Sequence, residues 1–246
     1  MKKQSFFPFV KSLILIMIIP IASFGQSGVK PVDSHDVFNH FNKLYQIDAR
    51  LVNGDFYNTP SISKATGHPF FISSDWKNGS VSMEGVVFEN LQLRYDISSG
   101  LIILNTAGFT NTAVQLVLKK DRIDYFTMDG NLFQAYPDDD PMTGIRFCQV
   151  LEEGAIDFVL IRSKNLKVTT TGRSDFAYQT KQSRIIRIGD ELHPYLSRHS
   201  LIKLYPDLKP DLRLFLKENR LRFKKMSNNE HARFVKYCNS LIESSQ

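Results

Sequence analysis

Hydrophobic and polar residues alternate with a period of two in short runs between residues 70 and 192, which is typical of β-strands with one buried face. In Leu91–Asp96, for example, every second residue is apolar, so we expect one face of that strand to be wet. The predicted strands cover residues 70–73, 80–83, 86–88, 91–96, 101–105, 113–118, 123–128, 132–136, 145–151, 155–161, 166–170, 176–179 and 185–188.

Short turn sequences separate these strands, at Asn78-Gly79, Glu84-Gly85, Ser99-Gly100, Asp129-Gly130 and Gly154. Several connections are too short for a crossover helix, so neighbouring strands are expected to pair antiparallel. A meander of about ten strands must curl, split or close. The expected fold class is therefore mainly β (α+β): a curled antiparallel meander sheet, sandwich or partial barrel, with a short N-terminal helix and a C-terminal helical hairpin packed on it.

Helical periodicity appears only on either side of this region. Residues 36–46 carry one apolar stripe and predict a short helix, whereas residues 50–69 are rich in Gly, Asn, Ser, Thr and Pro and predict a turn and a loop. Near the C-terminus, a short helix is expected over residues 201–205. A second helix is expected from its cap at Asp207 to about Asn219.

A final helix is predicted from the Ser227-x-x-Glu230 spacing, which is that of a capping box. Residues 220–225 are interpreted as an extended return between the last two helices. The final helix is expected to bury an apolar stripe made of Phe234, Val235, Cys238, Leu241 and Ile242. Because about 50 residues make a marginal core alone, residues 197–246 are expected to pack on the sheet (residues 70–192) within one domain, residues 26–246.

The N-terminus has the pattern of a secretory signal peptide, with basic residues followed by the uncharged stretch Leu13–Phe24. Twelve residues are too few for a bilayer core, which needs about 20. Small residues at Ser23 and Gly25 predict cleavage after Gly25, and the alternative is an uncleaved helix. We therefore expect an exported protein, periplasmic or secreted, with no transmembrane segment after cleavage.

Composition is that of a folded globular chain, with 246 residues of which 42% are hydrophobic and 23% charged. The formal net charge of +6 falls to +3 without the three lysines of the predicted signal peptide. The remaining charge is uneven, because residues 196–246 hold 11 Lys and Arg against 5 Asp and Glu. The C-terminal part is thus the basic part of the chain.

These basic residues gather on one side of the predicted helix and its return. At about 100° per residue, Arg213, Lys217 and Arg220 fall within about 60° of one another, beside the apolar stripe. The predicted surface for an anionic partner consists of Arg213, Lys217, Arg220, Arg222, Lys224 and Lys225. Such a surface suits an anionic lipid, an acidic glycan or an acidic protein. The alternative is a solvated face whose apolar side packs on the acidic β-region. Nucleic acid is not expected, because no stacking aromatics interleave with these charges.

Three segments together resemble a family of uncharacterised exported proteins common in Bacteroidetes-type bacteria. They are a Gly79-Ser-Val-x-x-x-Gly85-x-x-Phe88 hairpin, the sequence Leu93-Arg-Tyr95-Asp96, and the tail SLIKLYPDLKPDLRLFLKENRLRF. The resemblance covers most of the chain after the signal peptide. It implies secretion, a β-rich body and a helical C-terminus, and it supplies no catalytic or binding residues.

Sequence motifs with known catalytic mechanisms are missing: there is no Gly-x-Ser-x-Gly elbow, no His-Glu-x-x-His and no phosphate loop. No catalytic residue, cofactor or metal site is therefore predicted. Asp138-Asp139-Asp140 lacks the alternating spacing of a calcium loop, so a solvated loop is favoured. The histidines form no metal pattern, and His231 is interpreted as a neutral core residue.

The two cysteines, Cys148 and Cys238, leave two alternatives open. They could form a disulfide in an exported protein, or they could be two buried, inert thiols. A catalytic role is less favoured, since there is no Cys-x-x-Cys and neither residue lies in an electropositive loop.

The sequence therefore favours an exported binding or interaction module of the cell envelope, with a hydrophobic ligand or an extended peptide as a suitable guest for a curled sheet. The alternative is a hydrolase acting on envelope glycans or peptides, with its site around residues 54–76. A hydrolase should place Asp55, His68 and Asp75 around one cleft, with Trp76 as a stacking or packing residue. A purely structural partner of a larger assembly is the third class.

Overall fold

The computed structural model describes residues 48–58, 65–107, 112–137, 144–169, 175–189 and 191–244. The predicted signal peptide, the predicted helix over residues 36–46 and Asp138-Asp139-Asp140 lie outside these ranges. The described strands are β1 (Asp55–Phe56), β2 (Ala65–Thr66), β3 (Lys77–Met83), β4 (Val86–Asp96), β5 (Leu101–Ala107), β6 (Ala113–Val117), β7 (Ile123–Met128), β8 (Asn131–Pro137), β9 (Ile145–Glu152), β10 (Asp157–Val168), β11 (Phe176–Ile188) and β12 (Glu191–Pro194).

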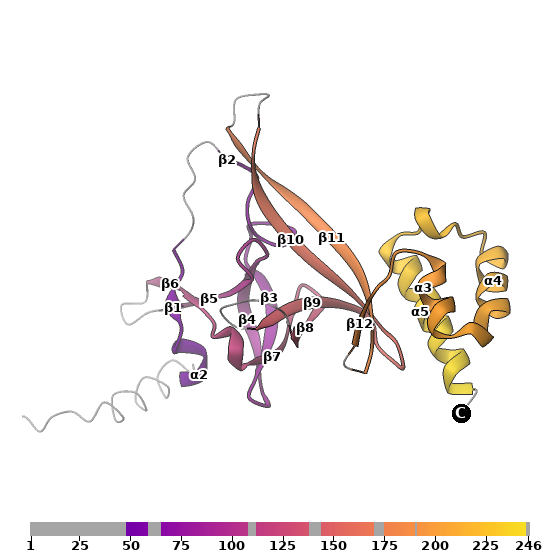
Figure 1. Ribbon diagram of the computed structural model, residues 1–246. Helices are drawn as coiled ribbons and strands as arrows, with labels where there is room; N and C mark the ends of the chain where they lie inside the picture. Colours follow the sequence, from indigo (N-terminus) through magenta and orange to yellow (C-terminus); the bar gives the residue numbers. More distant parts are fainter. Residues whose placement is uncertain are drawn as a thin grey trace, which may run out of the picture.

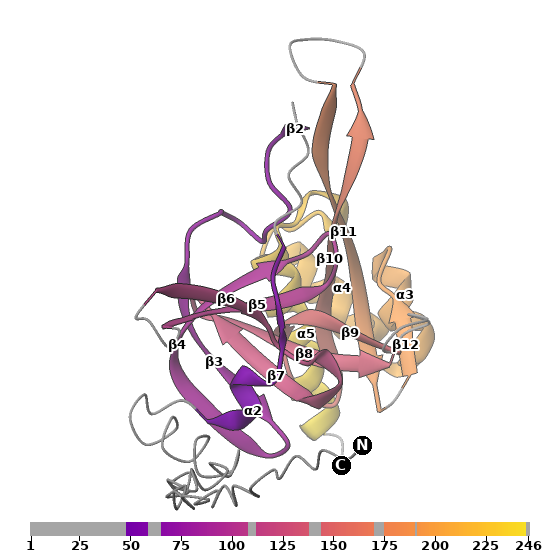
Figure 2. The same cartoon turned by 90° about the vertical axis from the view of Figure 1, so that its left-hand side faces the viewer.

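All of these strands belong to one sheet, in the order β1-β6-β5-β4-β3-β7-β8-β9-β10-β11-β12, with β2 paired to β11. Two meanders run in opposite directions from the β3–β7 pair, and every pairing is antiparallel except that of β2 with β11. The sheet curls, and the helices of residues 198–244 lie on one side of it, where the last helix contacts β9 and β10 (Figures 1 and 2). The predicted fold class, a mainly β protein with a curled antiparallel sheet and C-terminal helices, is confirmed.

Several predicted strand boundaries are wrong because the strands run through expected interruptions. Residues 86–96 form one strand, although Asn90 has a left-handed backbone (φ 57°). Asn78-Gly79 is not a turn but lies within β3, where a Cβ on Gly79 would collide with the backbone oxygen of Thr127 on β7. Residues 70–73 form no strand and contribute a single bridge, between Phe70 and Asp96.

Two of the predicted turns have the backbone that a tight hairpin requires. Glu84 and Gly85 have φ values of 52° and 77°, and Asp129 and Gly130 have 51° and 74°. Positive φ at both central residues is the geometry whose twist matches paired strands. These turns therefore fix the register of the β3–β4 and β7–β8 hairpins.

An aromatic cluster forms the core of the first sheet region. The rings of Phe126 and Phe133 stack with centroids 4.6 Å apart, and Tyr95 meets both edge-on at 5.2 and 5.3 Å. Phe71 and Phe147 pack against the same rings. We call this group, with the aliphatic side chains around it, the body core.

The helices and 3₁₀ turns of the described chain are α2 (Ala49–Val52), η1 (Lys120–Arg122), α3 (Arg198–Leu204), η2 (Pro206–Leu208), α4 (Lys209–Glu218), η3 (Phe223–Lys225) and α5 (Asn228–Ser244). The predicted capping box at the start of α5 is confirmed, because the Glu230 carboxylate accepts from the Ser227 N–H (2.7 Å) and Glu230 N–H donates to Ser227 Oγ (3.2 Å). The expected cap at Asp207 is wrong. Residues 206–208 form η2 instead, and α4 begins at Lys209 without a side-chain cap.

A second hydrophobic cluster joins these helices to β10 and β11. Phe158 and Ile186 of the sheet pack with Leu212 of α4 and with Phe234 and Cys238 of α5. We call this cluster the helical core. His231 is fully buried within it: its Nδ1 lies 3.4 Å from the Tyr195 hydroxyl, and burial lowers its pKa to about 4. The predicted burial of His231 in the core is confirmed, and the lowered pKa favours the neutral form.

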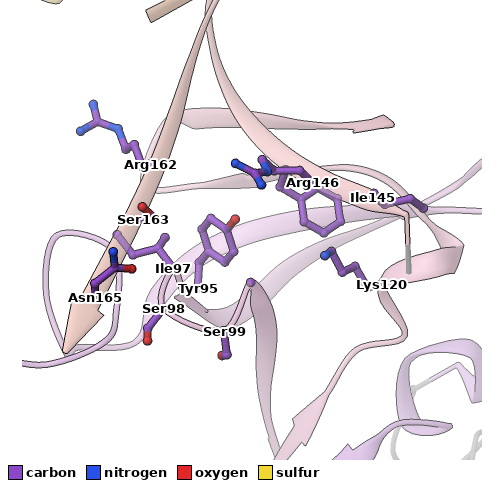
Figure 3. A pocket seen from close by; sticks show the side chains of 12 residues that line it. Tyr95, Ile97, Ser98, Ser99, Lys120, Ile145, Arg146, Arg162, Ser163 and Asn165 are labelled. Carbon is purple, nitrogen blue, oxygen red and sulfur yellow. The ribbon is translucent and has the colours of Figure 1, made fainter. Parts of the chain in front are cut away.

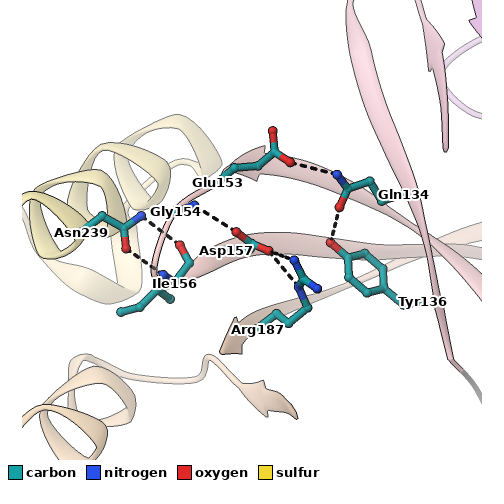
Figure 4. A network of polar contacts seen from close by, with 8 residues as sticks. All are labelled: Gln134, Tyr136, Glu153, Gly154, Ile156, Asp157, Arg187 and Asn239. Atoms are coloured by element: carbon teal, nitrogen blue, oxygen red, sulfur yellow. Dashed lines mark hydrogen bonds and ion pairs between the residues drawn. The ribbon is translucent and has the colours of Figure 1, made fainter. Parts of the chain in front are cut away.

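A polar joint ties α5 to the turn between β9 and β10 (Figure 4). The Asn239 side chain accepts from Ile156 N–H and donates to Ile156 C=O, both at 2.9 Å and both buried. Gly154 lies so close that a Cβ there would collide with the Asn239 amide. Asp157 accepts from Gly154 N–H at 3.0 Å and from the Arg187 guanidinium. These contacts hold the helical part on the sheet.

Candidate functional site: a cationic groove

A groove of about 600 Å³ lies between α3, α4 and η3. It is lined by Ser197, Arg198, His199, Arg213, Leu216, Lys217, Leu221, Arg222, Phe223, Lys224 and Lys225. Six of these residues are cations and none is acidic. We call this feature the cationic groove.

Local sequence places each wall of the groove. Ser197 caps α3, with its Oγ 3.2 Å from His199 N–H, so Arg198 and His199 stand in the first turn of that helix. Arg213 and Lys217 are four residues apart on α4 and so share a face.

The end of α4 turns the chain back along the groove. Arg220 adopts a left-handed backbone (φ 52°), and Leu221 N–H bonds to Leu216 C=O at 2.8 Å. This is a Schellman-type ending, which brings the side chains on either side of the turn into contact. As a result, Leu216 and Leu221 both line the groove, and η3 follows with its basic residues.

The cations of the groove carry no internal counter-charge. Within the described ranges, no ion pair or side-chain hydrogen bond joins any of the six to another residue. All six side chains are exposed, whereas Leu216 is buried and Leu221 and Phe223 are half-buried. Like charges held close together repel, so a bound anion would stabilise this arrangement. The groove therefore combines an apolar floor with a positively charged rim.

Five of the six residues predicted as an anionic-partner surface line this groove: Arg213, Lys217, Arg222, Lys224 and Lys225. Arg220 does not line it, because Arg220 occupies the left-handed turn that ends α4. The sequence prediction missed Arg198 and His199. It placed the start of the short helix after Ser200, whereas Ser197 and Ser200 form a reciprocal cap three residues earlier. The Ser197-x-x-Ser200 spacing is the sequence signal that could have predicted this earlier helix start.

The residues of the hydrolase alternative come from separate segments of the described chain, and no hydrogen bond joins them. Asp55 lies on β1 opposite Val117, and His68 stacks on Phe70 with its Nδ1 3.4 Å from Lys164 Nζ. Burial lowers the pKa of His68. No hydrogen bond or ion pair joins any two of Asp55, His68 and Asp75, all of which are described.

Trp76 makes a packing contact in the same region. The Arg94 guanidinium carbon lies 4.0 Å from the centroid of its ring and 5.2 Å from that of Phe70. Arg94 therefore covers one face of the Trp76 indole ring. This contact fits the packing alternative for Trp76.

The two cysteines are not joined by a disulfide. Cys238 lies in the helical core, and Cys148 lies in a separate small cluster with Tyr136, Val150 and Val159. Both side chains are buried, and burial raises the pKa of the Cys238 thiol to about 11. Of the two alternatives that the sequence left open, the structure has the buried thiols.

Two searches of the described residues find nothing further. No group of three or more His, Cys, Asp or Glu side chains there could hold a metal ion. No helix in the same residues is long and apolar enough to cross a membrane.

Comparison of the chain with protein families, with curated proteins and with solved structures gives no match. The functional interpretation therefore depends on the geometry of the groove.

Proposed function

We propose that this protein is an exported binding module of the cell envelope, and that its cationic groove holds an anionic amphiphile. The observation that carries the proposal is the combination of six exposed cations, none of them in an ion pair within the described ranges, with an apolar floor of Leu216, Leu221 and Phe223. An anionic head group would contact the rim while an apolar chain covers the floor.

Exposed leucines beside the lining residues favour an amphiphile over a simple anion. Leu196 directly precedes Ser197 and is 79% exposed, and Leu214 directly follows Arg213 on α4 and is 49% exposed. Apolar side chains next to a cationic surface are typical of proteins that contact lipids or other amphiphiles. Electrostatic attraction of this kind contributes about 1 kcal/mol per basic residue near an anionic surface.

Binding is tested by calorimetric titration of residues 26–246, the chain after the predicted signal peptide, with dodecyl phosphate below its micelle concentration. We expect saturable binding that weakens as salt rises, because salt screens the exposed charges. Dodecyl maltoside, which has the same chain and no charge, should bind much more weakly. Equal binding of the two detergents would contradict the proposal.

A charge variant makes the test specific to the groove. Replacing Arg213, Lys217 and Arg222 by Gln should weaken dodecyl phosphate binding about 100-fold, since three contacts of about 1 kcal/mol each are removed. The matched control replaces Lys203, Lys209 and Arg233, which are exposed cations outside the groove. An equal loss of affinity in the two triple variants would show attraction to net charge alone.

A further inference from the structure

A small pocket of about 170 Å³ lies between the segment that precedes β3 and the long β10–β11 hairpin. The residues that line it are Phe71, Ile72, Ile97, Arg162, Lys164 and Thr180. Lys164 of β10 and Thr180 of β11 are opposite each other in the register of the hairpin. We call this feature the arginine pocket. It shares no lining residue with the cationic groove.

Main-chain hydrogen bonds hold the walls of the arginine pocket together. Phe71 N–H donates to Tyr95 C=O at 2.8 Å. Ile97 N–H donates to Pro69 C=O at 3.1 Å, so the segment before β3 runs beside the end of β4. Lys164 N–H donates to Ile97 C=O at 3.3 Å, which joins β10 to the same frame. The side chains that line the pocket therefore stand on a hydrogen-bonded backbone.

The Arg162 side chain turns toward this pocket. It leaves β10 on the side away from Tyr95 and Arg146 (Figure 3). Its guanidinium carbon lies 5.4 Å from the centroid of the Phe71 ring, and its Nε donates to Gln149 Oε1 at 2.6 Å. The two terminal nitrogens of the guanidinium make no hydrogen bond or ion pair with any described residue. Such a planar pair of free donors matches the two oxygens of a carboxylate.

The second cation of the pocket, Lys164, is fixed by the frame itself. Its Nζ donates to Phe70 C=O at 2.6 Å and to His68 C=O at 3.0 Å. Burial lowers the pKa of Lys164, and the charge of the nearby Asp96 carboxylate opposes this shift. No Asp or Glu lines the pocket. Because Asp96 partly balances Lys164, Arg162 supplies the positive charge that an anion in the pocket would meet.

An exposed isoleucine in a strained turn forms part of the apolar side of the pocket. Ile72 is 63% exposed and has a left-handed backbone (φ 50°), which is rare for a β-branched residue. Ser73 N–H donates to Phe71 C=O at 2.6 Å across it, which makes a γ-turn of the strained class. Glycine would fit this turn without strain. A contact with an apolar ligand would give the isoleucine a use that the folded chain alone does not.

We propose that the arginine pocket binds a short apolar monocarboxylate of about four or five carbon atoms. Arg162 would donate to the carboxylate, together with the Thr180 hydroxyl, which has no hydrogen bond to a described residue. Ile72 and Ile97 would cover the apolar chain. A volume of about 170 Å³ is below the range of sites for larger small molecules, as a ligand of this size requires.

Methyl NMR of residues 26–246 at neutral pH tests the pocket, with isovalerate as the probe. The matched control is isovaleramide, which has the same shape and no charge. Isovalerate should shift the methyl signals of Ile72 and Ile97 saturably and should bind about tenfold more tightly than isovaleramide, because a charged pair is the stronger. Unchanged signals in excess isovalerate, or equal binding of the amide, would overturn the proposal. Equally tight binding of formate would also contradict it, since the pocket would then recognise a bare oxyanion.

Two variants locate the binding. Arg162→Gln should weaken isovalerate binding about tenfold, because the charged partner of the carboxylate is lost. The control Arg94→Gln removes a cation that lies over Trp76 and outside the pocket, and it should leave the affinity unchanged.

Ile72→Gly separates binding from folding. The glycine relieves the strained turn and removes the apolar contact, so the protein should be at least as stable while the isovalerate shift of Ile97 weakens. Unchanged affinity in both Arg162→Gln and Ile72→Gly would show that isovalerate binds elsewhere and would refute the assignment. The triple variant of the cationic groove should retain isovalerate binding.

Discussion

Several cations in the body of the sheet have partners within the protein, whereas the cations of the cationic groove have none among the described residues. In the body, Arg50 pairs with Asp48 at 2.6 Å, and Arg94 and Arg162 lie over aromatic rings. In the cationic groove, none of the six cations has an ion pair or an aromatic partner within the described ranges, although Phe223 lies among them.

Partnered cations contribute to the fold where they stand, because each contact offsets part of the cost of fixing a long side chain. Cations without partners make no such contribution and repel one another. Within the described ranges, the groove therefore gathers six cations that no ion pair or ring contact uses, which makes it a candidate for binding an external ligand. A variant at the joint between the two regions tests their separation, and measurements on His231 and the cysteines test buried groups within them.

The largest effect is expected at the polar joint between the regions. Asn239→Ala leaves Ile156 N–H and C=O buried without partners, so the free energy of unfolding should fall by about 2–4 kcal/mol. Urea unfolding followed by circular dichroism measures this loss. The control Asn228→Ala removes a partly exposed amide that contacts Gln182 and Arg184, and it should cost less than about 1 kcal/mol.

Hydrogen exchange sharpens the same comparison. Relative to the unmodified protein, Asn239→Ala should accelerate exchange of the α5 amides more than exchange of the β7 amides. The reason is that the joint holds the helices and not the body core. Equal acceleration in α5 and β7 would show that the two cores unfold as one unit.

A smaller effect is expected from pH, through His231. Its folded-state pKa of about 4 lies below the ordinary value of 6.5, so the unfolded chain binds the proton first as pH falls. Stability should therefore be full above pH 6.5 and should decrease between pH 6.5 and 4, by up to about 2 kcal/mol at pH 5. In His231→Gln this part of the decrease should disappear. The exposed-site control His199→Gln should keep the decrease of the unmodified protein.

The last prediction concerns the reactivity of the two cysteines and involves no change in stability. Both thiols are buried and burial raises the pKa of Cys238, so iodoacetamide at pH 8 should not modify the native protein. In urea without reductant, mass spectrometry should find two labels per chain. A mass with no label under those conditions would reveal a disulfide and contradict the structure.

Much of the fold could be predicted because the signals are local. Turn chemistry at Glu84-Gly85 and Asp129-Gly130, the capping box at Ser227 and the apolar stripe of α5 each depend on a few neighbouring residues. The errors have non-local causes. Gly79 looks like a turn residue, yet it lies within a strand because the backbone of Thr127 approaches too closely for any side chain.

The candidate sites show the same division. Arg213 and Lys217 could be placed on one face from helical periodicity, whereas Arg198 joins them only through the packing of α3 beside α4. The separation of β10 from β9 after Leu160, where β10 continues beside β11, could not be predicted at all. Nothing in the sequence near Leu160 marks the point where two strands separate.

The central claim is that the cationic groove holds an anionic amphiphile, and methyl NMR with dodecyl phosphate tests it most directly. The methyl signals of Leu216 and Leu221 should shift on titration, while those of Leu93 and Ile102 in the body core should not. The shifts should be lost in the triple variant at Arg213, Lys217 and Arg222. Unchanged Leu216 and Leu221 signals at saturating dodecyl phosphate would contradict the account.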